Sequence, residues 1–324
     1  MTAAVETMMY AKDVPWHRIG TYVGDEPIPW MQALQKSGLD WRVELRKLFS
    51  NDGGMFQEVP GWKRVARETD DETLGIVTNR YAPIQNEDSF RFMDTLVGAK
   101  QLRYETAGSL RGGKQIFMVA VTNKEMFVKD DQIIPYLVLS NTHDGTGRLN
   151  VILTYIRVVC MNTLTMAMQD SRGRKFGIKH TGVKDFSALQ EHTDRAQEVL
   201  GLAKNSMDNF EMMASRMANV DMTSDMLEKY LLALVPDPVN PETSKTRAEN
   251  ARDAIRSALE TFPGYDTTAA NGTVWGMLNA ATAYSTHLKT TKGGDAGRVA
   301  SNLYGSSQAF ANRAWNKAVE LAVA

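Results

Sequence analysis

The stretch "IIPYLVLSNTHDGTGRLNVILTYIRV", Ile133 to Val158, determines the fold class that we expect for this chain. Two runs rich in Val, Ile, Leu and Tyr flank the turn "HDGTG" at His143 to Gly147. Such runs are typical of β-strands, and the glycines of the turn can adopt the positive φ that a hairpin requires. We therefore expect an antiparallel pair of strands here.

Similar short runs precede this hairpin and are separated by turn residues. The turns "NDGG" at Asn51 to Gly54 and "RGGK" at Arg111 to Lys114 also supply glycines, which favours further long hairpins. The expected strands cover residues 41–49, 61–69, 73–78, 101–110, 114–122, 133–142 and 148–158.

One helix is expected to interrupt the strands, over the sequence "NEDSFRFMDTLVG" at residues 86–98. Asn86 can cap this helix, and the acidic Glu87 and Asp88 suit its first turn. A second, short helix is expected at residues 162–169, directly after the last strand.

After about residue 185 the apolar residues recur with a period of 3.6, which predicts helices. The first is a long amphipathic helix at 193–220, and the proline-rich "VPDPVNPET" and the turn-rich "FPGYDTTAANGT" separate later ones. The expected later helices cover residues 224–234, 244–261, 273–288 and 297–322. The predicted architecture is α+β, with an antiparallel, hairpin-rich sheet and flanking helices in residues 1–190 and an all-helical region in residues 191–324.

The composition indicates an ordinary soluble protein of 324 residues, in which 37 Lys and Arg nearly cancel 38 Asp and Glu. The single cysteine excludes an internal disulfide and a zinc site built from several thiolates, which suits a reducing cytoplasm. The first twenty residues carry acidic side chains where a signal peptide needs a basic start and an apolar core, so we expect no secretion. No apolar run reaches the roughly 20 residues that span a bilayer. We expect a cytoplasmic protein that is not inserted in a membrane.

Two places invite a catalytic interpretation. Cys160 needs a base to become a nucleophile, and its apolar neighbours favour a buried, inert thiol. His143 and Asp144 are adjacent, but they stand in a predicted hairpin turn. Phosphate-binding and dinucleotide-binding glycine motifs are also missing from the sequence. We therefore expect no catalytic residue, metal or cofactor, and we keep an enzyme that uses Cys160 or the His143 and Asp144 pair as an alternative.

The distribution of charge is more informative than the net charge. Between Gly147 and Lys184 the basic residues are numerous, whereas Asp170 is the only acid. Basic side chains that bind phosphates, interleaved with aromatic side chains that stack on bases, are typical of single-strand binding. A solvated surface or an oligomer interface would produce the same pattern. The candidate nucleic-acid-binding residues in this segment are Arg148, Tyr155, Arg157, Arg172, Arg174, Lys175, Phe176 and Lys179.

Other residues could extend this surface. Alternation along the last strand places Arg157 and Tyr155 on one face and Cys160 on the other. Arg111 and Lys114 on the "RGGK" turn are expected to close the binding groove. Further basic residues in the first strands are Arg46, Lys47, Lys63 and Arg64.

Six motifs follow one another along the chain. They are "PWHRIG" (15–20), "RYAPIQNEDSF" (80–90), "NTHDGTGRL" (141–149), "IRVVCMNTL" (156–164), "IKHTG" (178–182) and "TVWGMLNAATAYSTHL" (273–288). Together they resemble a known family, the phage and plasmid-like proteins described as domain of unknown function 932, and the resemblance covers nearly the whole chain in order. It implies a protein of bacteriophages and mobile elements that acts in the host cytoplasm.

The order of helix, sheet with long hairpins and second helix is similar to the core of single-strand annealing recombinases of the Red-beta type. That resemblance implies binding of single-stranded DNA by a homo-oligomer that forms a ring or filament, with basic residues of the sheet lining the groove. The alternative is a protein-interaction or counter-defence factor that binds a host protein and has no enzymatic activity.

Overall fold

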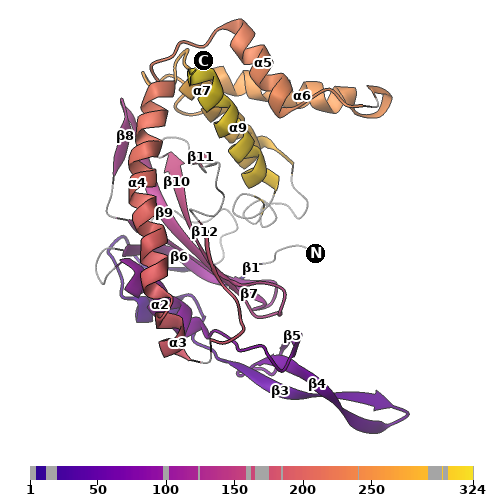
Figure 1. Ribbon diagram of the computed structural model, residues 1–324. Coiled ribbons are helices and arrows are strands. Elements are labelled where there is room, and N and C mark those ends of the chain that lie inside the picture. Colours follow the sequence, from indigo (N-terminus) through magenta and orange to yellow (C-terminus); the bar gives the residue numbers. More distant parts are fainter. Residues whose placement is uncertain are drawn as a thin grey trace.

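The structure is a computed structural model that describes residues 5–11, 20–97, 102–122, 125–157, 162–164, 175–183, 185–239, 241–290, 301 and 306–323. It contains a large, mostly antiparallel sheet, a smaller antiparallel sheet and helices that flank the large sheet and continue into a helical C-terminal region (Figure 1). The predicted α+β class is confirmed.

The centre of the large sheet is an antiparallel meander, with the strand order β11-β10-β9-β7-β6-β1-β2. Its four central strands match the expected ranges to within two residues at each end. They are β6 (Leu102–Leu110), β7 (Gln115–Thr122), β9 (Asp131–Thr142) and β10 (Leu149–Arg157). The expected hairpin turns are confirmed by the positive φ of Gly112, Gly113 and Gly145.

Five short strands of this sheet were not expected from the sequence. They are β1 (Val5–Tyr10), β2 (Thr21–Tyr22), β8 (Met126–Val128), β11 (Asn162–Leu164) and β12 (Lys175–Ile178). The helix predicted at 162–169 is therefore wrong over its first three residues. They form β11 instead, because they pair with the end of β10 from Tyr155↔Leu164 to Arg157↔Asn162.

The smaller sheet has the order β3-β4-β5, formed by β3 (Val43–Asp52), β4 (Met55–Arg67) and β5 (Thr73–Thr78). A large β-bulge interrupts the pairing of β3 and β4, because Lys47↔Lys63 is followed directly by Phe49↔Glu58. Beyond this bulge the hairpin continues without β5 and projects from the body (Figure 1). We call this projecting segment, residues 48–61, the arm.

Helices α2 (Asn86–Val97) and α4 (Thr193–Met217) cover one face of the large sheet (Figure 1). The short helices α1 (Trp30–Lys36) and α3 (Phe186–Gln190) were not predicted. In the C-terminal region the predicted helices are confirmed as α5, α6 and α7, and α9 is the described part of the helix expected at 297–322. Their bounds are α5 (Ser224–Leu234), α6 (Pro241–Thr261), α7 (Val274–Ala283), which continues as the π-helix η1 (Tyr284–Leu288), and α9 (Ser306–Val323).

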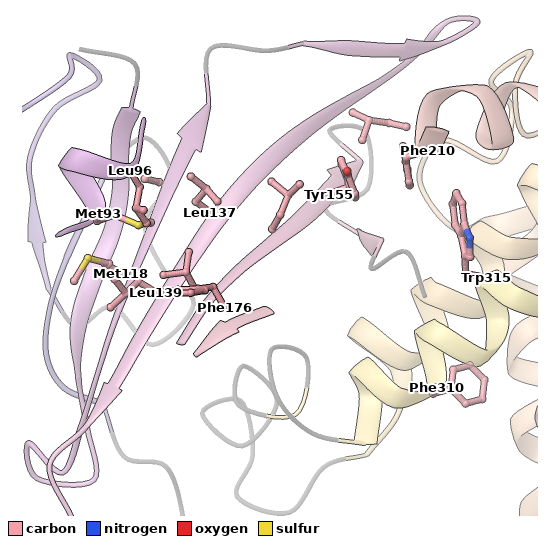
Figure 2. Packing of buried hydrophobic residues seen from close by; sticks show 14 of the residues in the cluster. Met93, Leu96, Met118, Leu137, Leu139, Tyr155, Phe176, Phe210, Phe310 and Trp315 are labelled. Atoms are coloured by element: carbon pink, nitrogen blue, oxygen red, sulfur yellow. The ribbon is translucent and has the colours of Figure 1, made fainter. Parts of the chain in front are cut away.

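One hydrophobic core connects the sheet with the helical region. Met93 and Leu96 of α2 lie over the sheet, and farther along the sheet an aromatic stack continues into the C-terminal helices (Figure 2). In this stack the ring of Tyr155 on β10 lies 4.2 Å from that of Phe210 on α4, which lies 4.8 Å from that of Trp315 on α9. The core thus crosses the predicted domain boundary at residue 190, and that boundary stays a prediction.

None of the helices in the described part of the chain combines the length and the apolar character needed to cross a membrane.

Candidate nucleic-acid interface

A cleft of about 390 Å³ lies along the free edge of β5. Its walls come from β4 and β5, from the turn between β9 and β10, and from the segment that follows β12. We call it the β5 cleft. It is lined by Trp62, Ile76, Val77, Thr78, Tyr81, Gly145, Gly147, Arg148, Lys179, His180 and Thr181.

Two glycines let the β9–β10 turn approach β5 closely. A Cβ atom on Gly75 would lie 2.7 Å from backbone atoms of Asp144, and one on Gly145 would lie 2.6 Å from the side chain of Val77. Gly145 also has a φ of 79°, which other residues rarely adopt. The position of the turn, and with it one wall of the cleft, therefore depends on these two residues.

Trp62 and Ile76 give the β5 cleft an apolar wall. Trp62 is 47% exposed and Ile76 is 52% exposed, so together they present apolar surface to the cleft. Trp62 is the last residue of the β-bulge, directly after Gly61 with its φ of 82°. Bulges often re-aim a side chain near a functional site, and this one brings the indole to the cleft. Trp62 was not among the predicted site residues, although the proline and glycine of "PGW" (60–62) were a signal for the bulge.

Arg148 and Lys179 give the β5 cleft its positive charge. Leu149 on β10 pairs with Ile178 on β12, so the two basic residues that flank this pair come to neighbouring positions. Both side chains are exposed, and neither forms a salt bridge to an acidic residue of the described chain. The structure thus brings together two of the predicted phosphate-binding residues.

The two predicted base-stacking residues are wrong for this role. Tyr155 has 0% exposure and stacks on Phe210, and Phe176 is 9% exposed with its ring 6.4 Å from that of Phe92. The prediction required one face of this part of the sheet to be open to solvent. Helices α2 and α4 cover that face, so these rings belong to the core.

Arg111 lies outside the lining of the β5 cleft. Its guanidinium lies 3.5 Å from the carboxylate of Asp144 and donates a 3.2 Å hydrogen bond to Gln115. Lys114 is half-buried, and its carbonyl accepts a 2.8 Å hydrogen bond from the backbone of His143. The "RGGK" turn thus supports the neighbouring "HDGTG" turn.

Several further basic candidates do not extend the cleft. Arg46 and Arg64 both form ion pairs with Asp71, and Lys47 forms one with Glu58 at 2.8 Å. Their charge is therefore largely compensated. Lys63 is half-buried on β4 and does not line the cleft. Arg172, Arg174 and Cys160 lie outside the described residues, as do the side chains of Arg157 and Lys175.

A buried network of hydrogen bonds connects the β9–β10 turn with the core. The side-chain amide of Asn86 donates hydrogen bonds to the carbonyls of Leu39 (3.0 Å) and Trp41 (3.2 Å). Its oxygen therefore accepts the 2.8 Å bond from Nε2 of His143, which assigns the proton of this histidine to Nε2. Asn86 was expected to cap α2. Its side chain instead joins the start of α2 to two distant segments.

His180 forms the floor of the cleft beside this network. Its Nδ1 donates a 3.3 Å hydrogen bond to the carbonyl of Ala82, and its ring stacks on Tyr81 at 4.8 Å. Burial lowers the pKa of His180 to about 4. Burial lowers the pKa of His143 to about 3, with a smaller contribution from the positive charge that His180 carries once it is protonated. Both rings are therefore neutral at pH 7, and the positive charge of the cleft comes from Arg148 and Lys179.

The geometry of His143 and Asp144 fits a structural turn. The ring of His143 is directed into the core toward Asn86, whereas the carboxylate of Asp144 accepts hydrogen bonds from the backbone (2.9 Å) and the hydroxyl (2.6 Å) of Thr146. Within the described ranges, no three His, Cys, Asp or Glu side chains are grouped so that they could hold a metal ion. Both side chains of the pair thus have hydrogen-bond partners within the described chain.

Three motifs that are far apart in the sequence meet at this site. The segment 80–90 supplies Tyr81 and Asn86, the segment 141–149 supplies the turn and Arg148, and the segment 178–182 supplies Lys179 and His180. Each of these segments is one of the motifs on which the family resemblance rests. The motif at 273–288 lies elsewhere, in α7 and η1.

Comparisons with curated proteins and with solved structures gave no match to the chain. A family model, described as domain of unknown function (DUF932), matches residues 73–305. This range covers more than two thirds of the chain, and it includes β5, the β9–β10 turn and His180, but not Trp62. The resemblance found in the sequence is thereby confirmed, and the chain belongs to the DUF932 family.

Proposed function

We propose that this protein is a phage-type protein that binds single-stranded DNA in the β5 cleft and promotes strand annealing as a homo-oligomer in the host bacterial cytoplasm. The observation that carries the proposal is one cleft in which the exposed Trp62 and Ile76 lie with Arg148 and Lys179, neither of which forms a salt bridge to an acidic residue within the described part of the chain. A single strand presents phosphates for the cations and unstacked bases for the indole.

A double helix matches this cleft less well. The faces of its bases are covered by their neighbours, so an indole can stack on a base only after the duplex is unstacked at that step or the base is flipped out, and either change costs a few kcal/mol. A cleft of about 390 Å³ has room for a splayed base beside the two cations, but not for a duplex. Strand pairing makes and breaks no covalent bond, so the proposal requires neither a catalytic residue nor a cofactor.

Removal of the cations should weaken binding in a manner that depends on salt. For single strands, the slope of log K against log salt changes by about 0.7 for each phosphate contact. We therefore expect Arg148→Ala and Lys179→Ala each to weaken binding and to reduce this slope by about 0.7. The measurement is the anisotropy of a labelled oligonucleotide between about 50 and 300 mM salt, a range over which the Debye length falls roughly twofold. Arg247→Ala on α6, an exposed cation remote from the cleft, is the matched control and should change neither quantity. Absence of binding at low salt, or binding insensitive to salt, would refute the proposal.

Trp62→Ala should weaken binding without changing its dependence on salt. Stacking of a base on an aromatic side chain contributes about 1–3 kcal/mol, so affinity should fall roughly 5- to 150-fold. The salt slope should stay unchanged, because no cation is removed. Tyr265→Ala provides the control, since Tyr265 is similarly exposed at 45% and does not line the cleft. Equal affinity of Trp62→Ala and the unaltered protein would mean that bases do not stack in this cleft.

A further inference from the structure

An exposed arginine that is not among the predicted site residues lies at the margin of the β5 cleft. Arg80 stands in the turn after β5, between Thr78 and Tyr81, and both of these residues line the cleft. It belongs to the segment 80–90, which already supplies Tyr81 to the site. Because an arginine side chain is long and carries its donors at the end, Arg80 can reach a ligand that occupies the cleft.

The backbone holds Arg80 beside Trp62. The N–H of Asn79 donates a 3.1 Å hydrogen bond to the carbonyl of Gly61, which directly precedes Trp62. One residue earlier, Thr78 pairs with Trp62 in the smaller sheet. The segment that carries Arg80 is therefore fixed at the β-bulge, next to the indole that we propose to stack on a base.

No salt bridge neutralises Arg80 within the described part of the chain. The acidic side chains of the adjoining elements have basic partners of their own. These pairs are Asp71 with Arg64 (2.6 Å), Glu87 with Arg42 (3.7 Å) and Asp144 with Arg111 (3.5 Å). The positive charge of Arg80 thus stays available to an anionic ligand.

The cations around the cleft come from three separate segments. Arg80 follows β5, Arg148 follows the β9–β10 turn and Lys179 follows β12. The smaller sheet holds Arg80 near Trp62, whereas the register of β10 with β12 brings Arg148 and Lys179 together. A base stacked on Trp62 would therefore have Arg80 near one of its phosphates and the other two cations on its opposite side.

We infer that Arg80 binds a phosphate of the strand in the β5 cleft, next to the base stacked on Trp62, while Arg148 and Lys179 bind the backbone on the other side of that base. A guanidinium can donate two parallel hydrogen bonds to one phosphate, which suits this role. The inference rests on the proposed function and specifies the part of the strand that the cleft takes. A nucleotide that is linked on both sides lies in the interior of a strand, so the cleft requires neither strand end.

The salt dependence of binding tests the role of Arg80. Arg80→Ala should weaken binding of a labelled oligonucleotide and reduce the slope of log K against log salt by about 0.7, the value for one phosphate contact. Arg80→Lys should restore the slope, because lysine keeps the positive charge. Arg247→Ala on α6 is the matched control and should change neither affinity nor slope. Since Arg80 is exposed, its variants should melt at the temperature of the unaltered protein.

The outcomes separate this inference from the proposed function. An unchanged slope in Arg80→Ala, or a reduced slope that Arg80→Lys does not restore, would overturn the role of Arg80. The proposed function survives that result as long as Arg148→Ala and Lys179→Ala reduce the slope. Absence of binding by the unaltered protein at low salt would refute both.

A circular oligonucleotide provides the second test, because all of its nucleotides are interior ones. It should bind with the same affinity as a linear strand of equal length and sequence, and Arg80→Ala should weaken binding of both to the same extent. Binding of the linear strand alone would show that the cleft takes a strand end. That result would overturn the inference, although the protein would still bind single-stranded DNA.

Discussion

Acidification from pH 7.5 to pH 5 should reduce the free energy of unfolding through His143 and His180 by about 4 kcal/mol. Burial holds the pKa values of these rings near 3 and 4 in the folded protein, whereas both titrate near 6.5 once the chain unfolds. Below pH 6.5 the unfolded chain therefore binds two protons that the folded protein excludes. This contribution to stability is complete above pH 6.5, decreases as the pH falls toward 4, and should be measured by urea unfolding at each pH.

A single substitution separates the contribution of the histidines to this pH dependence from the contribution of the carboxyl groups. Burial raises the pKa values of Asp88 and Asp94, so these two groups oppose the loss as the pH falls. His180→Phe keeps an aromatic ring on Tyr81 but removes one titrating group. The difference in unfolding free energy between pH 7.5 and pH 5 should then shrink by about 2 kcal/mol. An unaltered difference in this variant would show that His180 is not the source of the pH dependence.

Asn86→Ala should destabilise the protein by about 3–5 kcal/mol. The substitution leaves the carbonyls of Leu39 and Trp41 and the Nε2–H of His143 without their buried partner. Each such group retains its desolvation penalty without a hydrogen bond in return. Chemical unfolding monitored by circular dichroism gives the difference in free energy.

Asn219→Ala is the matched control for Asn86. Asn219 is exposed and its amide donates a 2.9 Å hydrogen bond to Ser215 within one helical turn, so its removal should change stability by less than about 0.5 kcal/mol. A loss below about 1 kcal/mol for Asn86→Ala would mean that the network around His143 adapts without this residue.

The regular elements could be predicted because their signals are local. The strand ranges 73–78 and 133–142, and the helix 224–234, follow from periodicity and from turn residues within a few positions. The strand β1 could not be predicted in this way. It is only six residues long, and it forms by pairing with β6 about a hundred residues later, which no local signal reveals.

The candidate site was predicted only in part, for a related reason. Arg148 and Lys179 were identified from charge alone, and the register of β10 with β12 then placed them together. Alternation along β10 separates the two faces of the sheet, but it does not reveal which of them the helices cover. Tyr155 was consequently assigned to an open face, and Trp62 was overlooked because its exposure depends on a bulge in the smaller sheet.

The aromatic stack of Tyr155, Phe210 and Trp315 has a consequence for synthesis of the chain. Phe210 covers Tyr155 only after 55 further residues have been translated, and Trp315 covers Phe210 only after another 105. During translation the sheet therefore presents an uncovered apolar surface, and its folding depends on contacts between distant segments, which form slowly. On the ribosome, a nascent chain arrested before Trp315 should consequently be a better chaperone substrate than one arrested after it.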